Sequence, residues 1–317
     1  MIAVASVVVA ATVDAVRGRQ GDERPGATTE LSDREDLAPA LAALGTRGQL
    51  VVYGSGGCAK RMFELPSLDR TQDRGSCVPR GAVSPDGNLV ARCLGDETEV
   101  FHAVDGGLER IVPGCTPAWQ PDGTLTVAME RAVVRFRACS GPDSCPVTLI
   151  SRRELHRAAR RHPTVPDIPV RLRVLVDGIA WVSQTRAAVL LSIRISGRLA
   201  GLGALSEIVF FENGRLAPAA RTYIRGTGGR LGASPRGTYV TQTPDVILRP
   251  DGSQVSLPQH LRDVRAFGWS ADERFLALAT RFAVSILDVS SLERYDQVGS
   301  GLRSVTLPLR ATGLAWR

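Results

Sequence analysis

A motif that recurs six times constrains the fold more than any other feature of this chain. The motif is a short apolar stretch followed by a turn such as Ser84-Pro85-Asp86-Gly87, and successive copies lie 36, 62, 52, 36 and 47 residues apart. Units of about 40–50 residues are typical of β-propeller blades. All four tryptophans of the chain occupy the same position in the motif. We expect the aligned positions to anchor the blade cores: Val83, Trp119, Trp181, Ala233, Trp269 and Trp316.

Each copy has the residues of a small antiparallel sheet. Proline fixes φ at the second position of the turn, and glycine accepts a positive φ at the fourth. A β-prone strand follows the turn, as at residues 124–128 and 275–279, and a further strand follows that one. Hairpin signals such as Asn213-Gly214 and Asp251-Gly252 then precede a last strand. The pattern predicts a four-stranded antiparallel meander in each repeat.

The two ends of the repeat region predict how the ring closes. Residues 49–53 have the pattern of the second strand of a blade that lacks its first, and Trp316-Arg317 follows an innermost-strand motif. Pairing these strands would complete one blade and remove open sheet edges. We therefore predict an all-β fold: a six-bladed β-propeller of four-stranded antiparallel blades over residues 46–317, closed by its N- and C-terminal strands, with one short inserted helix.

The Trp-Ser-Pro-Asp-Gly type of repeat resembles the WD-like propeller repeats of TolB and of the propeller domains in prolyl oligopeptidase relatives. The resemblance covers about 85% of the chain. It is uneven, because the third unit lacks Pro-Asp-Gly and the fifth has Ala271-Asp272-Glu273. The resemblance implies the fold and a TolB-like scaffold, and it brings no partner-binding residue to this chain because none of the interaction motifs of TolB is evident.

An apolar segment precedes the repeats. Residues 2–16 are too short for a membrane span, which needs about 20 residues, and they have the length of a signal-peptide core. We predict a signal peptide or membrane anchor at 1–16 and a linker or short helix at 17–45. Arg17 and Arg19 follow the apolar segment, and by the positive-inside rule they would place the rest of the chain in the cytoplasm. The alternative is therefore that residues 1–16 are the apolar tail of a cytoplasmic protein.

Six cysteines decide the predicted compartment. An even number within one stretch favours disulfides and an oxidising environment. Fifteen pairings are possible; joining nearest neighbours (58–77, 93–115 and 139–145) is the simplest, and buried free thiols are the alternative. None of the cysteine spacings is CxxC, so the sequence does not indicate a zinc site. We predict a protein outside the cytoplasm, periplasmic, secreted or membrane-anchored, with these disulfide candidates: Cys58, Cys77, Cys93, Cys115, Cys139 and Cys145.

The net charge of +7 does not by itself indicate nucleic acid. Lys60 is the only lysine among 39 basic residues, a bias expected from a GC-rich genome, and the arginines are scattered among acids. Arginines are concentrated in one segment, residues 151–163, which is predicted to be a helix with a capping box at Ser151 and Glu154. It is either a solvated helix lying on the propeller or a contact site for acidic lipid headgroups, phosphate or an acidic protein face. Its basic residues are Arg152, Arg153, Arg157, Arg160 and Arg161.

No catalytic constellation emerges from the sequence. HExxH, P-loop and GxSxG motifs are absent, and Asp86, Asp122 and Asp272 recur at one turn position, which favours turn chemistry over metal binding. We predict a monomeric, non-catalytic propeller without metal or cofactor, tethered to a membrane if the apolar segment is retained. Its predicted ligand is a protein or a cell-envelope component, and nucleic acid is not expected. The alternative is a six-bladed enzyme of the lactonase or lyase type, which would need acidic, Asn or His side chains around a metal in the central channel.

Overall fold

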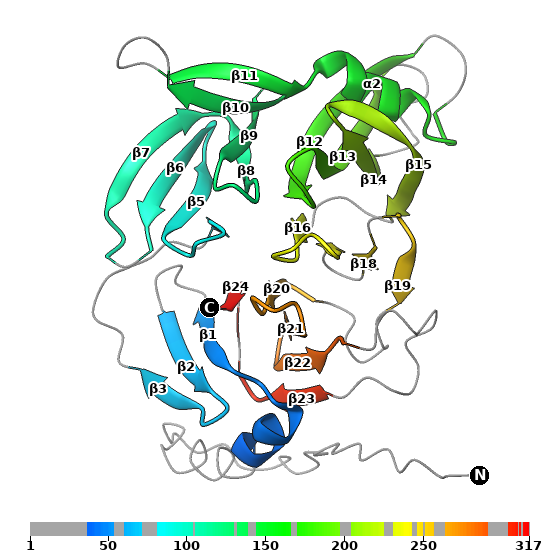
Figure 1. The fold of residues 1–317 in the computed structure, drawn as a ribbon. Coiled ribbons are helices and arrows are strands. Elements are labelled where there is room, and N and C mark those ends of the chain that lie inside the picture. The colour runs from blue at the N-terminus through cyan, green and yellow to red at the C-terminus, as the bar shows by residue number, and fades with distance from the viewer. Residues whose placement is uncertain are drawn as a thin grey trace, which may run out of the picture.

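Six antiparallel sheets are arranged as the blades of a ring (Figure 1). The computed structural model describes residues 37–53, 60–71, 81–103, 105–129, 132–138, 144–165, 170–196, 204–224, 231–242, 246–249, 251–256, 264–290, 304–309, 311 and 313–316. Each sheet has four strands, and neighbouring strands run in opposite directions. The prediction of a six-bladed all-β propeller is confirmed.

The first three blades follow one another along the chain. Blade 1 contains β4 (Ala82–Val83), β5 (Leu89–Leu94), β6 (Glu97–His102) and β7 (Leu108–Pro113). Blade 2 contains β8 (Cys115–Trp119), β9 (Leu125–Met129), β10 (Ala132–Ala138) and β11 (Ser144–Ile150). Blade 3 contains β12 (Arg171–Trp181), β13 (Arg186–Ser196), β14 (Ala204–Glu212) and β15 (Arg215–Ile224).

The other three blades complete the ring. Blade 4 contains β16 (Leu231–Ala233), β17 (Val240–Gln242), β18 (Val246–Leu248) and β19 (Gln254–Ser256). Blade 5 contains β20 (Ala266–Trp269), β21 (Phe275–Ala279), β22 (Val284–Asp288) and β23 (Ser304–Leu307). Blade 6 combines both ends of the repeat region: β24 (Gly313–Trp316), β1 (Gly48–Tyr53), β2 (Lys60–Leu65) and β3 (Asp69–Thr71).

Blade 6 closes the ring as the sequence predicts. β24 pairs antiparallel with β1, so that Trp316 lies opposite Leu50 and Gly313 lies opposite Tyr53. The ring of Trp316 also stacks on Phe275 of blade 5, with 5.8 Å between ring centroids. Strand β24 therefore connects β1 of blade 6 to the neighbouring blade 5.

The predicted turns have the expected geometry. In the turns after β4, β8 and β16, the fourth residue is glycine with φ between 75° and 84° (Gly87, Gly123 and Gly237). Its N–H donates to the carbonyl of the first turn residue at 2.9 Å. In blade 5 the same position is Glu273, which holds φ at 60° without being glycine. Blade 5 thus keeps the backbone of the turn where its sequence departs from the motif, whereas the turn after β12 in blade 3 has no residue with positive φ.

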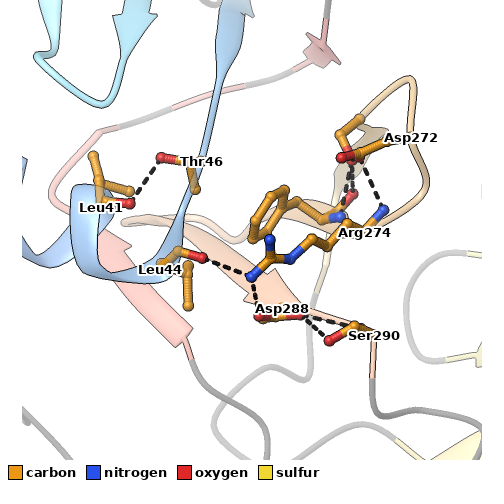
Figure 2. A network of polar contacts seen from close by, with 9 residues as sticks. Leu41, Leu44, Thr46, Asp272, Arg274, Asp288 and Ser290 are labelled. Atoms are coloured by element: carbon orange, nitrogen blue, oxygen red, sulfur yellow. Dashed lines mark hydrogen bonds and ion pairs between the residues drawn. The ribbon is translucent and has the colours of Figure 1, made fainter.

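Two helices add to the strands of the described chain. Residues 37–44 are helical, and Leu41 and Leu44 are buried against residues of blades 5 and 6. Figure 2 shows how this helix is held: Thr46 Oγ1 donates to the Leu41 carbonyl at 3.1 Å, and Arg274 Nη2 donates to the Leu44 carbonyl at 3.2 Å. The second helix, α2 (Arg152–Arg160), is the predicted insertion, located between blades 2 and 3.

The segment predicted to be a signal peptide or anchor, residues 1–16, lies outside the described residues. Of the helices that are described, none combines the length and the apolar character needed to cross a membrane.

Candidate functional site

The tryptophans that mark the repeat connect neighbouring blades. Trp181 Nε1 donates to Thr126 Oγ1 at 2.8 Å, and Trp269 Nε1 donates to Thr241 Oγ1 at 3.0 Å. Trp119 Nε1 donates to the Ala82 carbonyl at 2.9 Å. Each acceptor belongs to the preceding blade, so these indole groups are occupied in holding the ring together.

The remaining three anchor positions are less enclosed. Val83, Ala233 and Trp316 are half-buried, whereas the other three tryptophans are buried. Trp316 Nε1 donates to the Arg47 carbonyl at 2.9 Å, just before β1. Valine and alanine have no side-chain donor, so blades 1 and 4 make no equivalent bond through these positions.

The repeated aspartates are turn residues. Asp86 Oδ1 accepts from Ser84 Oγ at 2.6 Å and from the Asn88 amide at 3.1 Å. The bond from Ser84, followed by those from Asn88, lowers the pKa of Asp86 below its ordinary value. Asp122 accepts from the Thr124 amide at 2.9 Å in the same way.

Asp272 shows the same arrangement in blade 5. Its Oδ1 accepts from Ser270 Oγ at 2.6 Å and from the Arg274 amide at 3.1 Å. Burial raises the pKa of Asp272, but the hydrogen bonds from Ser270 and Arg274 outweigh it and the pKa is lowered overall. These carboxylates are already committed to the backbone of their turns.

The inner strands offer few groups for a central metal. Among their described residues the one acidic side chain is Asp177, at a bulge in β12, and Ser192 Oγ donates to it. Nowhere in the described chain do three His, Cys, Asp or Glu side chains form a group that could hold a metal ion. The half-buried residues of the neighbouring inner strands include Leu231 and Phe267.

A disulfide joins Cys93 to Cys115, with 5.0 Å between their Cα atoms. It connects β5 of blade 1 to β8 of blade 2, and the pair is one of the three nearest-neighbour pairs expected from the sequence. Cys145 is also disulfide-bonded. Cys58, Cys77 and Cys139 lie outside the described residues, so the other two predicted pairs stay predictions.

The basic helix α2 packs on blade 3 through its apolar face. Leu155, Ala158 and Ala159 are buried, as is His162 after the helix. Ser151 Oγ accepts from the Glu154 amide at 3.3 Å, as the capping signal predicts. Blade 3 therefore positions the helix firmly.

The five arginines of the predicted contact helix are all exposed. Two of them have partners: Arg157 pairs with Glu154 at 2.6 Å, and Arg160 Nη2 donates to the Val170 carbonyl at 2.8 Å. Arg152, Arg153 and Arg161 project from the same segment. The helix thus presents positive charge to solvent while its ends are fixed to the protein.

A second group of arginines was not singled out by the sequence patterns. Arg171 and Arg173 lie on β12, and Arg194 lies on β13, directly opposite Arg173. All three are exposed. The signal that could have revealed them is the alternation Arg171-Leu172-Arg173-Val174, which is typical of a strand with one face in solvent.

Comparisons with known proteins match the fold but give no family. No family model and no curated protein matches the chain. Among solved structures, the chain is similar to the β-propeller domain of Cps50 (Swd1) from Myceliophteria thermophila, with 13% identity over 84% of this chain and 89% of that one and a TM-score of 0.44. It is also similar to Hsv2 from Kluyvelomyces marxianus, with 10% identity over 75% of this chain and 85% of that one and a TM-score of 0.34. By its architecture the chain is a six-bladed β-propeller; a relation to WD-repeat-like propellers, and to TolB in particular, stays a prediction.

Proposed function

We propose that this chain is a non-catalytic binding propeller that works outside the cytoplasm and holds a protein or a cell-envelope ligand. The observation that supports this most is the distribution of charge. Residues 151–196, which include α2 and the first two strands of blade 3, contain nine arginines and three acidic residues. The net charge of this segment of 46 residues is +6, against −4 for residues 1–150 and +5 for residues 197–317. A local positive field on a rigid scaffold attracts and orients an anionic partner.

Photo-crosslinking in the producing cells tests the binding function. Arg161, exposed after α2, would be replaced by p-benzoylphenylalanine in the full chain; Arg110, exposed on β7 of blade 1, is the matched control. We expect a discrete crosslinked partner from position 161 and none from position 110. Identical adducts from both positions, or no adduct from position 161, would contradict a binding site on blade 3.

The disulfides support a location outside the cytoplasm, because such bonds persist in oxidising compartments. Mass spectrometry of the natively expressed protein under non-reducing conditions tests this. We expect all six cysteines to be paired. Six free thiols would remove the reason for export and make a cytoplasmic scaffold the better proposal.

The enzyme alternative has a separate test. Metal analysis of the purified full chain would detect a tightly bound ion in the central channel. One equivalent of calcium that survives dialysis would favour an enzyme of the lactonase or lyase type over a binding scaffold, whereas we expect none.

A further inference from the structure

The strands of blade 3 extend beyond those of blade 4. β12 and β13 have 11 residues each, and β16 and β17 have three each. β16 lies beside the later half of β12, where a Cβ added to Gly178 would come within 2.7 Å of Leu231 Cβ. Arg173 is five residues earlier, about 17 Å away along an extended strand. The first part of β12 therefore projects past the described strands of its neighbour.

Three arginines share one side of this projecting ribbon. Arg173 lies opposite Arg194, and Arg171 is two residues from Arg173, so the strand places it on the same side. The other side carries Val174, Ile193 and Ile195, which are buried in the same core cluster as Leu155 of α2. The arginines thus face away from the helix. We call this group the arginine ridge: Arg171, Arg173 and Arg194.

The ridge is costly for the fold. Like charges directly opposite each other on neighbouring strands destabilise a sheet. Elsewhere in the described chain, some strand arginines lie opposite glutamates, as Arg92 does with Glu99 at 2.7 Å and Arg186 does with Glu212. Others lie opposite uncharged residues, as Arg61 does with Val52. No such acidic partner lies opposite the ridge within the described residues. The other like-charge pair in the described strands, Glu64 opposite Asp69, differs because Glu64 accepts a hydrogen bond from Gln49 Nε2. A bound anion would give the ridge the partner that the described chain does not.

We propose that the arginine ridge binds an extended acidic segment of a partner protein in which carboxylates alternate along the chain. This inference rests on the proposed function and names its ligand class. Arg171 and Arg173 are about 6.6 Å apart along the strand, the repeat at which side chains on one side of an extended peptide follow one another. Each guanidinium can hold one carboxylate through two parallel hydrogen bonds.

The surroundings of the ridge favour a peptide over a membrane or a nucleic acid. Membrane-surface sites place large apolar side chains beside their basic residues. Single-stranded nucleic acids are held by aromatic stacking. In the described chain the large apolar side chains that are well exposed are Leu94, Leu108, Ile111 and Phe282, and none of them belongs to blade 3.

Fluorescence anisotropy with two labelled peptides tests the ridge on the full, disulfide-bonded chain. One peptide alternates Glu and Ser over eight residues; the other has the same composition with all Glu at one end. The double variant Arg173→Gln/Arg194→Gln is compared with Arg61→Gln/Arg70→Gln, which removes the same charge from exposed positions on β2 and β3 of blade 6. We expect the ridge variant to weaken binding of the alternating peptide about tenfold or more, and the blade 6 variant to change it less than about threefold. The block peptide should bind more weakly to the wild type.

Several results would overturn the proposal. Equal losses in both double variants would show general charge attraction. Equal binding of the two peptides would show that the ridge does not recognise the alternating spacing of carboxylates. Ridge-dependent binding of phosphatidylglycerol vesicles or of single-stranded RNA, without peptide binding, would assign another ligand class.

Two controls keep these outcomes interpretable. The ridge variant should melt no lower than the wild type, because it removes a like-charge pair, so a loss of binding cannot be assigned to unfolding. Crosslinking at position 161 reports separately on the proposed function. If position 161 captures a partner but the ridge binds neither peptide, the ligand proposed for the ridge is wrong and the proposed binding function of the chain still stands.

Discussion

At the scale of single residues, this propeller is held together by side chains that reach from one blade to the next. The tryptophans do so through their indole N–H groups, and Glu273 does so through its carboxylate, which accepts from the Arg236 amide of blade 4. The sequence repeat predicted that the tryptophans matter and where they lie. It could not predict their bonding, because the acceptors are a threonine or a carbonyl in the neighbouring repeat, and no local pattern marks them.

Replacing Trp181 by Phe tests this bonding. Trp181 Nε1 and Thr126 Oγ1 are both buried, so we expect Trp181→Phe to lower the free energy of unfolding by about 1–3 kcal/mol. Trp316→Phe is the control, because its acceptor lies at an exposed site and its loss should cost less. Urea unfolding of both variants measures the difference. Equal costs would contradict a special role for the buried bond.

Glu273 combines a strained backbone with a bond between blades. Glu273→Ala keeps the positive φ and loses the bond to the Arg236 amide, so we expect a loss of about 2 kcal/mol. Glu273→Gly loses the same bond but relieves the backbone, so it should be more stable than Glu273→Ala by about 1 kcal/mol. Glu273→Gln retains an acceptor and should lie near the wild type. If the alanine and glycine variants unfold at the same urea concentration, the backbone at this position is not strained.

The turn carboxylates give the stability a dependence on pH. A lowered pKa in the folded state means that the bonds of Asp272 stabilise the protein fully above its ordinary value of 3.8 and are lost as the pH falls through the folded-state pKa. We expect Asp272→Asn to melt below the wild type at neutral pH and the gap in melting temperature to close on acidification. Glu109→Gln, at an exposed position on strand β7, is the control for the loss of one negative charge. A gap that stays constant with pH would contradict this role.

At the scale of elements, the sequence predicted what repeats and missed what occurs once. Four-stranded blades and the helix over 152–160 followed from periodicity and capping residues, which are local signals. The contact of residues 37–44 with blade 5 depends on Arg274, far away in the sequence, whose side chain bonds to the Leu44 carbonyl and to Asp288 Oδ2 at 3.3 Å (Figure 2). The ridge was missed for a related reason, since it exists only where long strands stand beside short ones.

Removing the Arg274 side chain tests how the first helix is held. We expect Arg274→Ala to increase hydrogen–deuterium exchange in residues 41–46, because the Leu44 carbonyl loses its partner and the helix is secured less tightly. Exchange in α2 serves as the internal control and should not change. Unchanged exchange in residues 41–46 would show that burial of Leu41 and Leu44 alone fixes the helix.

At the scale of the whole molecule, six blades form one closed ring, and the densest positive charge lies on α2 and the first strands of blade 3. Closure depends on a strand from one end of the repeat region pairing with a strand from the other, about 260 residues apart. The sequence predicted this pairing because residues 49–53 have the pattern of the second strand of a blade with no first strand before it. The last motif supplies an innermost strand without the other strands of its blade. It could not predict the charge distribution around the ring, since that depends on which strands project.

An engineered crosslink measures closure most directly. Val51 and Ala315 lie opposite each other across the β1–β24 pair, at a separation that suits a disulfide. In the variant Val51→Cys/Ala315→Cys, we expect mild oxidation to give an intramolecular 51–315 linkage, identified by peptide mapping. Val51→Cys/Leu314→Cys, displaced by one residue to the other side of the strand, should link far less. No 51–315 linkage, or one found only between two chains, would contradict a ring closed by its own terminal strand.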